Sequence, residues 1–174
     1  MTIKKIITEP NKILRQISSP VEKVEDNERK IMDDMLDTMY ASNGIGLAAI
    51  QIGIPKRIIV IDIKKEHEKK SPLYFINPII NKKALDKSVY EEGCLSVPNQ
   101  FAEIERPSKC EVEYLDYYGE KKLLKADGLL ATCIQHEMDH LEGILFIDYL
   151  SKLKRSMISK KLSKQKNKPD RIVV

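Results

Sequence analysis

The segment DGLLATCIQHEMDHLEG (residues 127–143) predicts a helix. Asp127 precedes the segment's apolar run and Gly143 follows it, as expected where a helix begins and ends. Because positions i and i+4 share one face of a helix, His136 and His140 can point toward a common ion. Apolar residues recur at helical spacing, at Leu129, Leu130, Cys133, Ile134 and Leu141.

His136, Glu137 and His140 also form the H-E-x-x-H pattern of zinc peptidases. Glu137 is rotated from His136 by about 100° around a helix, so its carboxylate lies beside a shared ion and not on it. A base placed there can take a proton from water acidified by the metal. The alternative is a core helix whose polar residues match the pattern by chance. Two histidines also leave the site one ligand short of the three that a catalytic zinc site takes from the protein.

The residues downstream do not supply a convincing third ligand. Phe146 occupies the position of the third histidine in the metzincin pattern, and phenylalanine binds no metal. In thermolysin-like enzymes a carboxylate from a later helix completes the ligand set. Asp148 is the best downstream candidate for that role, but it does not lie in a suitable helix. His67 lies in the charged run KKEHEKK and is expected at the surface. The third ligand is therefore expected upstream.

Cys94, in EEGCLSVP, is the strongest upstream candidate because a flanking glycine allows close approach of its thiolate. Cys133 is a weaker candidate, and Cys110 follows an alternating strand pattern typical of the core. Most free cysteines are small buried hydrophobic residues. On the residues alone, that interpretation stays open for Cys94.

The rest of the chain predicts two further helices and several short strands. A helix is expected from about Asn27 to Ala41, with Asp26 as its N-cap. RIIVIDI (57–63) predicts a buried strand, and CEVEYLDYYGEKKLLK predicts a hairpin that turns at Tyr118 and Gly119. Helices at the front, middle and back of the chain, around short strands, indicate an α+β fold.

Composition is typical of a soluble globular protein, with 42% hydrophobic and 32% charged residues. We expect residues 1–174 to form a single domain, because no linker or repeat divides them. No apolar run reaches the length of a membrane span. The three cysteines suggest no disulfide framework, and the N-terminal stretch does not resemble a signal peptide. A reducing cytoplasm is therefore expected.

The net charge of +4 is concentrated near the C-terminus, where nine Lys or Arg face one acidic residue between Lys152 and Arg171. A third helix is expected from about Tyr149 to Lys168, so residues 150–174 predict a basic helix or tail. Such a tail can neutralise RNA phosphates. It can also pack on the domain through an apolar stripe formed by Leu150, Leu153, Met157 and Ile158.

Three motifs occur in order: GIGLAAIQ (44–51), EGCLS (92–96) and QHEMDH (135–140). With them the chain resembles the peptide deformylases, of the bacterial type 1 branch, over nearly its whole length. The resemblance implies the deformylase fold, in which short antiparallel strands surround a central metal-binding helix and a C-terminal helix follows. It also implies hydrolysis of the N-formyl group of N-formylmethionyl peptides, with release of formate.

The resemblance further implies the roles of the site residues. Cys94 would be the third metal ligand beside His136 and His140, and Glu137 the general base. The ion would be Fe²⁺ in the cell, with Zn²⁺, Ni²⁺ or Co²⁺ able to replace it. The oxyanion would be stabilised by the Gln51 amide and the Leu95 backbone N–H. Substrate contacts are expected from Ile45, Gly46, Gly93, Thr132 and Cys133, and support of the ligand histidines from Gln135, Asp139 and Arg106.

Two other functions stay open at this point: a metallopeptidase that cleaves internal peptide bonds, and an RNA-associated protein with a purely structural metal. A structural zinc site usually has four protein ligands, which favours catalysis here. The expected partners are N-formylmethionyl peptides and, through the basic tail, ribosomal RNA. We expect a cytoplasmic monomer with no membrane attachment.

Overall fold

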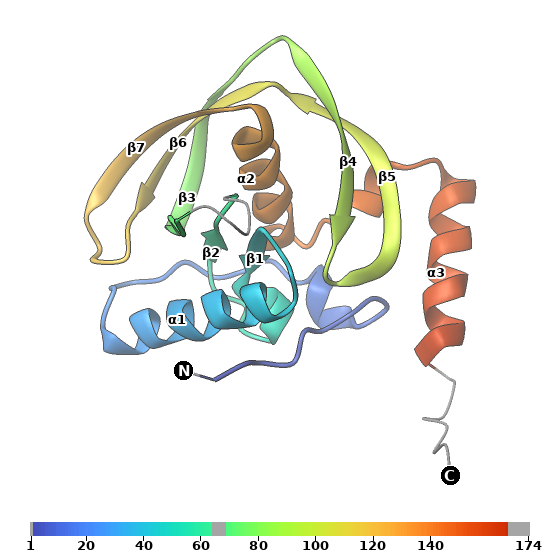
Figure 1. Ribbon diagram of the computed structural model, residues 1–174, viewed down its shortest axis with the longest axis horizontal. Coiled ribbons are helices and arrows are strands. Elements are labelled where there is room, and N and C mark those ends of the chain that lie inside the picture. The colour runs from blue at the N-terminus through green and yellow to red at the C-terminus, as the bar shows by residue number, and fades with distance from the viewer. Residues whose placement is uncertain (1, 64–68, 167–174) are drawn as a thin grey trace.

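The computed structural model describes residues 2–63 and 69–166 and shows an α+β fold, as the sequence predicts (Figure 1). The larger sheet has five antiparallel strands in the order β1-β2-β3-β6-β7. These strands are β1 (Gly46–Ala48), β2 (Ile58–Ile61), β3 (Leu73–Lys83), β6 (Lys109–Leu115) and β7 (Lys121–Asp127). The smaller sheet is the antiparallel pair β4 (Lys87–Cys94) and β5 (Val97–Pro107).

The helices are α1 (Asp26–Ala41), α2 (Gly128–Leu141) and α3 (Lys152–Lys166). Short 3₁₀ turns are η1 (Lys12–Arg15), η2 (Ala49–Ile52) and η3 (Phe146–Tyr149). In Figure 1, α2 lies between the larger sheet and the β4–β5 pair, and α3 lies outside β5. None of the helices in the described part of the chain combines the length and the apolar character needed to cross a membrane.

The central helix is buried on most of its surface. Ile134 and Leu141 of α2 pack into one cluster with Ile59 and Phe75 of the larger sheet. Gly143 ends the helix with φ +71°, a left-handed conformation that glycine adopts without strain. The two ends of the central helix therefore lie where the sequence predicts them.

Helix α1 begins one residue earlier than predicted. Glu25 is the N-cap residue, and its backbone N–H donates to Glu28 Oε2 at 3.3 Å. Asp26, the predicted cap, is the first helical residue and pairs with Arg29 at 2.7 Å instead. Two acidic residues, Glu25 and Asp26, are adjacent here, and Glu25 becomes the cap because the Glu28 carboxylate, three residues later, reaches its backbone N–H.

The predicted strand at 57–63 is confirmed as β2, whose four residues are fully buried. The predicted hairpin is also confirmed. Its strands are β6 and β7, and Gly119 lies in the turn with φ +83°.

Helix α3 begins at Lys152 and not at Tyr149, because residues 146–149 form the separate turn η3. The predicted apolar stripe is wrong in part, since Leu153 is 72% and Met157 is 63% exposed. The helix packs on the domain through Leu162, with Leu150 and Ile158 beside it. His67 and the end of the predicted tail lie outside the described residues.

Two leucines of α3 provide a test of this packing. Leu162 is 3% exposed and packs with Val97, Ile104 and Phe146, so Leu162→Ala should lower the free energy of unfolding by about 2–3 kcal/mol. Leu153→Ala, on the exposed side of the same helix, should change it by less than about 0.5 kcal/mol. Urea denaturation of both variants measures the difference, and equal effects would contradict the packing described.

Candidate metal centre

Cys94, His136 and His140 bring their ligand atoms together within 4.8 Å of one another. The Cys94 Sγ lies 3.2 Å from His140 Nε2. Helix α2 supplies both histidines from one face, and the end of β4 supplies the cysteine. In the part of the chain that the structure describes, this is the one group of such side chains that can hold a metal ion.

The tip of the β4–β5 hairpin places Cys94. The strand register shifts between Gly93 and Cys94, a local irregularity that changes the direction of the side chain. Gln51 lies next to it in η2 and is 1% exposed, so it is not a surface glutamine. Its Nε2 donates to Ser96 Oγ at 3.1 Å and to Cys94 Sγ at 3.6 Å, while its Oε1 accepts from Ala48 N–H at 2.8 Å.

Glu92 supports the metal centre, and the sequence analysis gave it no role. Its Oε2 lies 2.8 Å from His136 Nδ1. The same carboxylate accepts from Arg106 Nε at 2.5 Å and from Nη2 at 3.0 Å, a bidentate ion pair between buried side chains. Burial alone would raise the pKa of Glu92, but the hydrogen bonds from His136 and Arg106 lower it below the ordinary value. The carboxylate is therefore charged and orients the ligand histidine.

Two residues expected to hold the histidine rings do not contact them. Gln135 donates to the carbonyl oxygens of Pro107 and Ala131, at 2.9 and 3.0 Å. Asp139 accepts from Arg106 Nη1 at 2.8 Å and from the Tyr149 hydroxyl at 2.9 Å. In the described part of the chain neither side chain is hydrogen-bonded to a ligand ring, because the side chains next to a ligand on a helix point to other faces.

Arg106 links Asp139 and Tyr149 to Glu92, and it is buried, with 4% of its surface exposed. Its guanidinium also lies over the Tyr149 ring, 4.9 Å from the centroid. The carboxylates of Glu92 and Asp139 raise the pKa of Arg106 despite burial. Arg106 therefore stays protonated. Its contacts with Tyr149, Asp139 and Glu92 connect η3 and α2 to β4.

The two ligand histidines differ in their surroundings. Burial lowers the pKa of His140 well below its ordinary value, which keeps the imidazole in the neutral form that binds metals. Burial also acts to lower the pKa of His136, but hydrogen bonds with Cys94 and Glu92 raise it well above the ordinary value. Metal binding at this site therefore has to displace a proton.

Glu137 lies beside the ligands and is not one of them. It is 4% exposed, and its Oε2 has no hydrogen-bond partner in the described chain. Burial, as the main cause, raises the pKa of Glu137 to about 7. A carboxylate with that pKa can both accept and return a proton near neutral pH.

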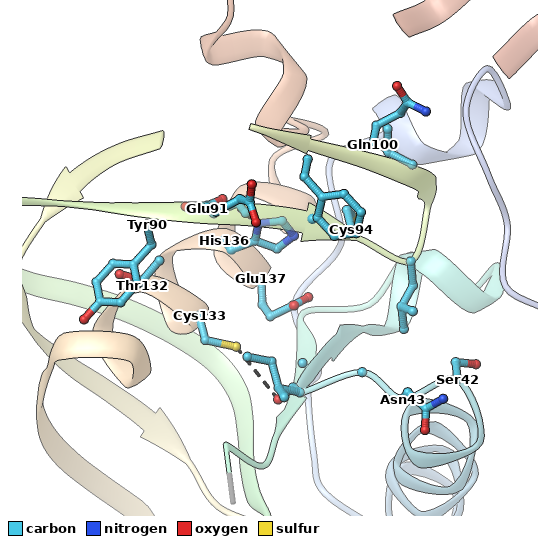
Figure 2. Close-up of a pocket in the computed structure, with 18 of the residues that line it drawn as sticks. Ser42, Asn43, Tyr90, Glu91, Cys94, Gln100, Thr132, Cys133, His136 and Glu137 are labelled. Carbon is cyan, nitrogen blue, oxygen red and sulfur yellow. Dashed lines mark hydrogen bonds and ion pairs between the residues drawn. The ribbon is translucent and has the colours of Figure 1, made fainter. Parts of the chain in front are cut away.

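A cavity of about 490 Å³ opens over these residues, between the β4–β5 hairpin and the segment from Ser42 to Gly46. Figure 2 shows Cys94, His136 and Glu137 in its interior, with Asn43 on one side and Gln100 on the other. The residues predicted to contact the substrate all line it: Ile45, Gly46, Gly93, Thr132 and Cys133. Leu95, in the turn between β4 and β5, lines it as well.

Two glycines of the cavity lining lie too close to other side chains to carry a side chain of their own. A Cβ on Gly46 would overlap Glu137 Oε1 and lie 2.8 Å from Cys133 Sγ. On Gly93 it would lie 2.5 Å from the Phe101 ring. A side chain at Gly46 would therefore displace the carboxylate, and one at Gly93 would displace the ring.

The other candidate ligands lie elsewhere. Asp148 pairs with Arg15 at 2.5 Å and with Arg155 at 3.1 Å. Cys133 directs its Sγ toward the Ile45 carbonyl at 3.9 Å, and Cys110 is a buried core residue. The donor set of one thiolate and two imidazoles, next to an unpartnered carboxylate, fits a catalytic divalent metal with three protein ligands.

The amino-acid sequence is similar to those of known proteins. A sequence model of the family described as polypeptide deformylase matches residues 3–156. A peptide deformylase from Pelagibacter ubique (strain HTCC1062) is 74% identical over 174 residues, which covers 100% of both chains. The chain belongs to the peptide deformylase family. Peptide deformylases are metalloenzymes that remove formyl groups from nascent peptides, so the predicted family and activity are confirmed, and the internal-bond peptidase is not supported.

Other deformylases agree in sequence and in fold. The peptide deformylase of Rhizobium meliloti (strain 1021) is 56% identical over 164 residues, 94% of each chain. The crystal structure of the Ehrlichia chaffeensis peptide deformylase in complex with actinonin has a TM-score of 0.92 at 45% identity. It covers 97% of this chain and 100% of that one, which confirms the deformylase fold.

The role of Glu92 in holding the metal ligand can be tested by Glu92→Gln. The amide cannot pair with Arg106 as an anion or accept equally well from His136, so metal affinity should fall by about 10- to 100-fold. Metal content after dialysis against increasing chelator concentrations measures this affinity. Glu103→Gln, an exposed position on the neighbouring strand, is the matched control and should retain metal as the unmodified chain does. Equal retention by a folded Glu92→Gln variant would show that the carboxylate does not support the ligand.

Proposed function

We propose that this deformylase releases formate from N-formylmethionyl peptides with the residue roles described below. The observation that carries the proposal is the unpartnered, buried Glu137 carboxylate beside the converging side chains of Cys94, His136 and His140. These three side chains would hold the metal, which when bound supplies the Lewis acidity that makes water acidic and stabilises negative charge.

Glu137 is the general base and acid in this proposal. Its Oε2 removes a proton from the attacking water and then delivers it to the nitrogen of the breaking amide bond. Burial raises the pKa of Glu137 to about 7, so the carboxyl group can hold and release a proton near neutral pH. The products are formate and the free amine of the peptide.

Gln51 and the turn after Cys94 stabilise the charge that forms on the formyl oxygen. The Gln51 amide is held by Ala48 N–H at 2.8 Å, so its Nε2 stays directed at the metal centre. The backbone N–H of Leu95, in the turn that lines the cavity, is the second donor. Donors fixed before the reaction stabilise the oxyanion without reorganising.

The peptide binds as an added strand between two sheet edges. Strand β1 ends the larger sheet and β4 belongs to a sheet of two, so each has an edge without a neighbouring strand. Ile45 and Gly46 on one side and Gly93 on the other offer backbone groups to an extended peptide. The methionine side chain then packs against the wall of the cavity that Thr132 and Cys133 form. An acetyl group would be rejected because its methyl overlaps the small space beside the formyl carbon.

For the ion we propose Fe²⁺ in the cell, with Zn²⁺, Ni²⁺ or Co²⁺ as substitutes. One thiolate and two imidazoles suit several divalent ions, so the donor set alone does not select among them. A Cys94 thiolate on Fe²⁺ would make activity sensitive to air and peroxide. Metal analysis after anaerobic purification from the native source checks the assignment, and zinc alone in fully active protein would contradict it.

The basic C-terminal segment, residues 150–174, would bind ribosomal RNA by neutralising phosphates, and the enzyme would act as a cytoplasmic monomer in one domain. Its described lysines Lys152, Lys154, Lys160, Lys161 and Lys164 are all exposed on α3, and Leu162 anchors the same helix. The helix can therefore present charge without leaving the domain. A single species at the mass of one chain in analytical ultracentrifugation would support the monomer.

The central prediction concerns Glu137→Gln. Formate release from formyl-Met-Ala-Ser should fall by about 10²- to 10⁴-fold, because the amide cannot transfer the proton. Metal content should stay the same, since Glu137 is not a ligand. Glu142→Gln, just beyond the end of the same helix and paired with Arg57 at the surface, should keep full activity. The N-acetyl peptide should not be hydrolysed by any variant. Full turnover by Glu137→Gln would remove Glu137 from the mechanism.

Ribosome binding is tested by neutralising the tail while keeping its anchor. The triple variant Lys160→Ala, Lys161→Ala, Lys164→Ala should sediment less with ribosomes at low salt, because fewer phosphates are neutralised. Its turnover of short peptides should not change. A control replaces three exposed lysines of β6 and β7, at Lys109, Lys121 and Lys125. If both triple variants sediment as the unmodified chain does, the tail does not dock.

A further inference from the structure

Thr132 is a polar residue of the cavity wall whose hydroxyl has no role in the reaction. It lies on α2 one turn before His136, is 3% exposed, and lines the cavity with Leu129 and Cys133. Figure 2 shows Thr132 with Tyr90 and Cys133 on one side of the cavity. Its Oγ1 is buried and has no hydrogen-bond partner among the described residues. A buried hydroxyl without a partner is unfavourable, so its presence in a binding cavity requires an explanation.

Two other hydroxyl side chains in the helices of the described chain make a local hydrogen bond. Thr38 of α1 donates to the Asp34 carbonyl oxygen, four residues earlier, at 2.6 Å. Ser163 of α3 donates to the Ser159 carbonyl oxygen at 2.9 Å. This local bond is the usual one for such residues inside a helix. Thr132 does not make it, so its hydroxyl is not committed to the helix backbone.

The surrounding wall indicates which ligand group would use it. Leu129 and Cys133 offer apolar, polarisable contacts that favour any unbranched side chain of suitable length. Such contacts cannot distinguish a thioether from a methylene group. A hydroxyl can, because sulfur accepts a hydrogen bond weakly and a methylene does not accept one.

We propose that the Thr132 hydroxyl donates a hydrogen bond to the thioether sulfur of the substrate's N-terminal methionine and so selects methionine over apolar side chains of the same length. This rests on the proposed function, which places that side chain against this wall. In the free chain Oγ1 exposes less than 1 Å², so the contact requires rotation about χ1. Threonine in a helix populates two χ1 conformers, which makes this rotation accessible.

The test compares formyl-Met-Ala-Ser with formyl-norleucine-Ala-Ser, in which a methylene replaces the sulfur. The metal-loaded enzyme should have a kcat/KM for formate release about fivefold higher on the methionine peptide. Thr132→Val keeps the shape and loses the hydroxyl, so its ratio should fall close to one. Thr132→Ser should retain the preference. Thr8→Val, a threonine outside the cavity lining, is the matched control and should keep the original ratio.

Several results would overturn the proposal. An unchanged ratio in Thr132→Val, with formate still released from both peptides, would mean that the hydroxyl does not select methionine. Loss of the preference in Tyr90→Phe alone would assign selection to the tyrosine in the same wall. If the enzyme released formate from neither peptide, the proposed function would be wrong, and so would the inference that rests on it.

Thermal unfolding in the absence of substrate provides a second, independent measurement. If the Thr132 hydroxyl has no partner in the free chain, Thr132→Val should unfold at the same temperature as the unmodified chain or at a higher one. A clearly lower unfolding temperature would show that the hydroxyl is already bonded, and the premise would be wrong.

Discussion

The buried ion pair between Arg106 and Glu92 is the interaction on which the metal centre depends. It joins β5 to β4, and through His136 and Asp139 it joins both strands to α2. Breaking a buried pair by removing one partner costs roughly 3–5 kcal/mol, because the other charge stays buried without compensation. Cys94 follows Glu92 by two residues on the same strand, so the pair that orients one ligand also fixes the strand that carries another.

The small sheet would not be stable alone, since two strands bury too little surface. It is held from outside by a cluster that includes Val97, Phe146 and Leu162, which explains how a helix as polar as α3 can support the site. The N-terminal segment contacts two parts of the site: Ile7 N–H donates to the Gln51 carbonyl of η2, and Glu9 N–H donates to the Ser96 carbonyl in the β4–β5 turn, both at 2.8 Å. Segments from both ends of the chain thus position two loops around one cavity.

Prediction from sequence succeeded where the determining interactions are local. Helix periodicity located α2, and turn residues located the β6–β7 hairpin. It failed where several local choices were equivalent. The sequence predicts Asp26 as the cap where the structure has Glu25, and it predicts that Leu153 and Met157 pack on the domain where both point to solvent. Glu92 belonged to a recognised motif, yet nothing in its neighbours on the chain shows that its carboxylate reaches His136.

The amino-acid sequence by itself determined the pairing of His136 with His140 and the placing of Glu137 beside them, because all three follow from the period of one helix. Its motifs also identified the family, and the family resemblance made Cys94 the expected third metal ligand. Only the tertiary structure decided that Cys94 reaches the histidines, that Glu92 rather than Gln135 or Asp139 contacts the His136 ring, and that the Thr132 hydroxyl is left without a partner. Those contacts join residues far apart in the chain, and they exist only once two sheets have packed against a common helix.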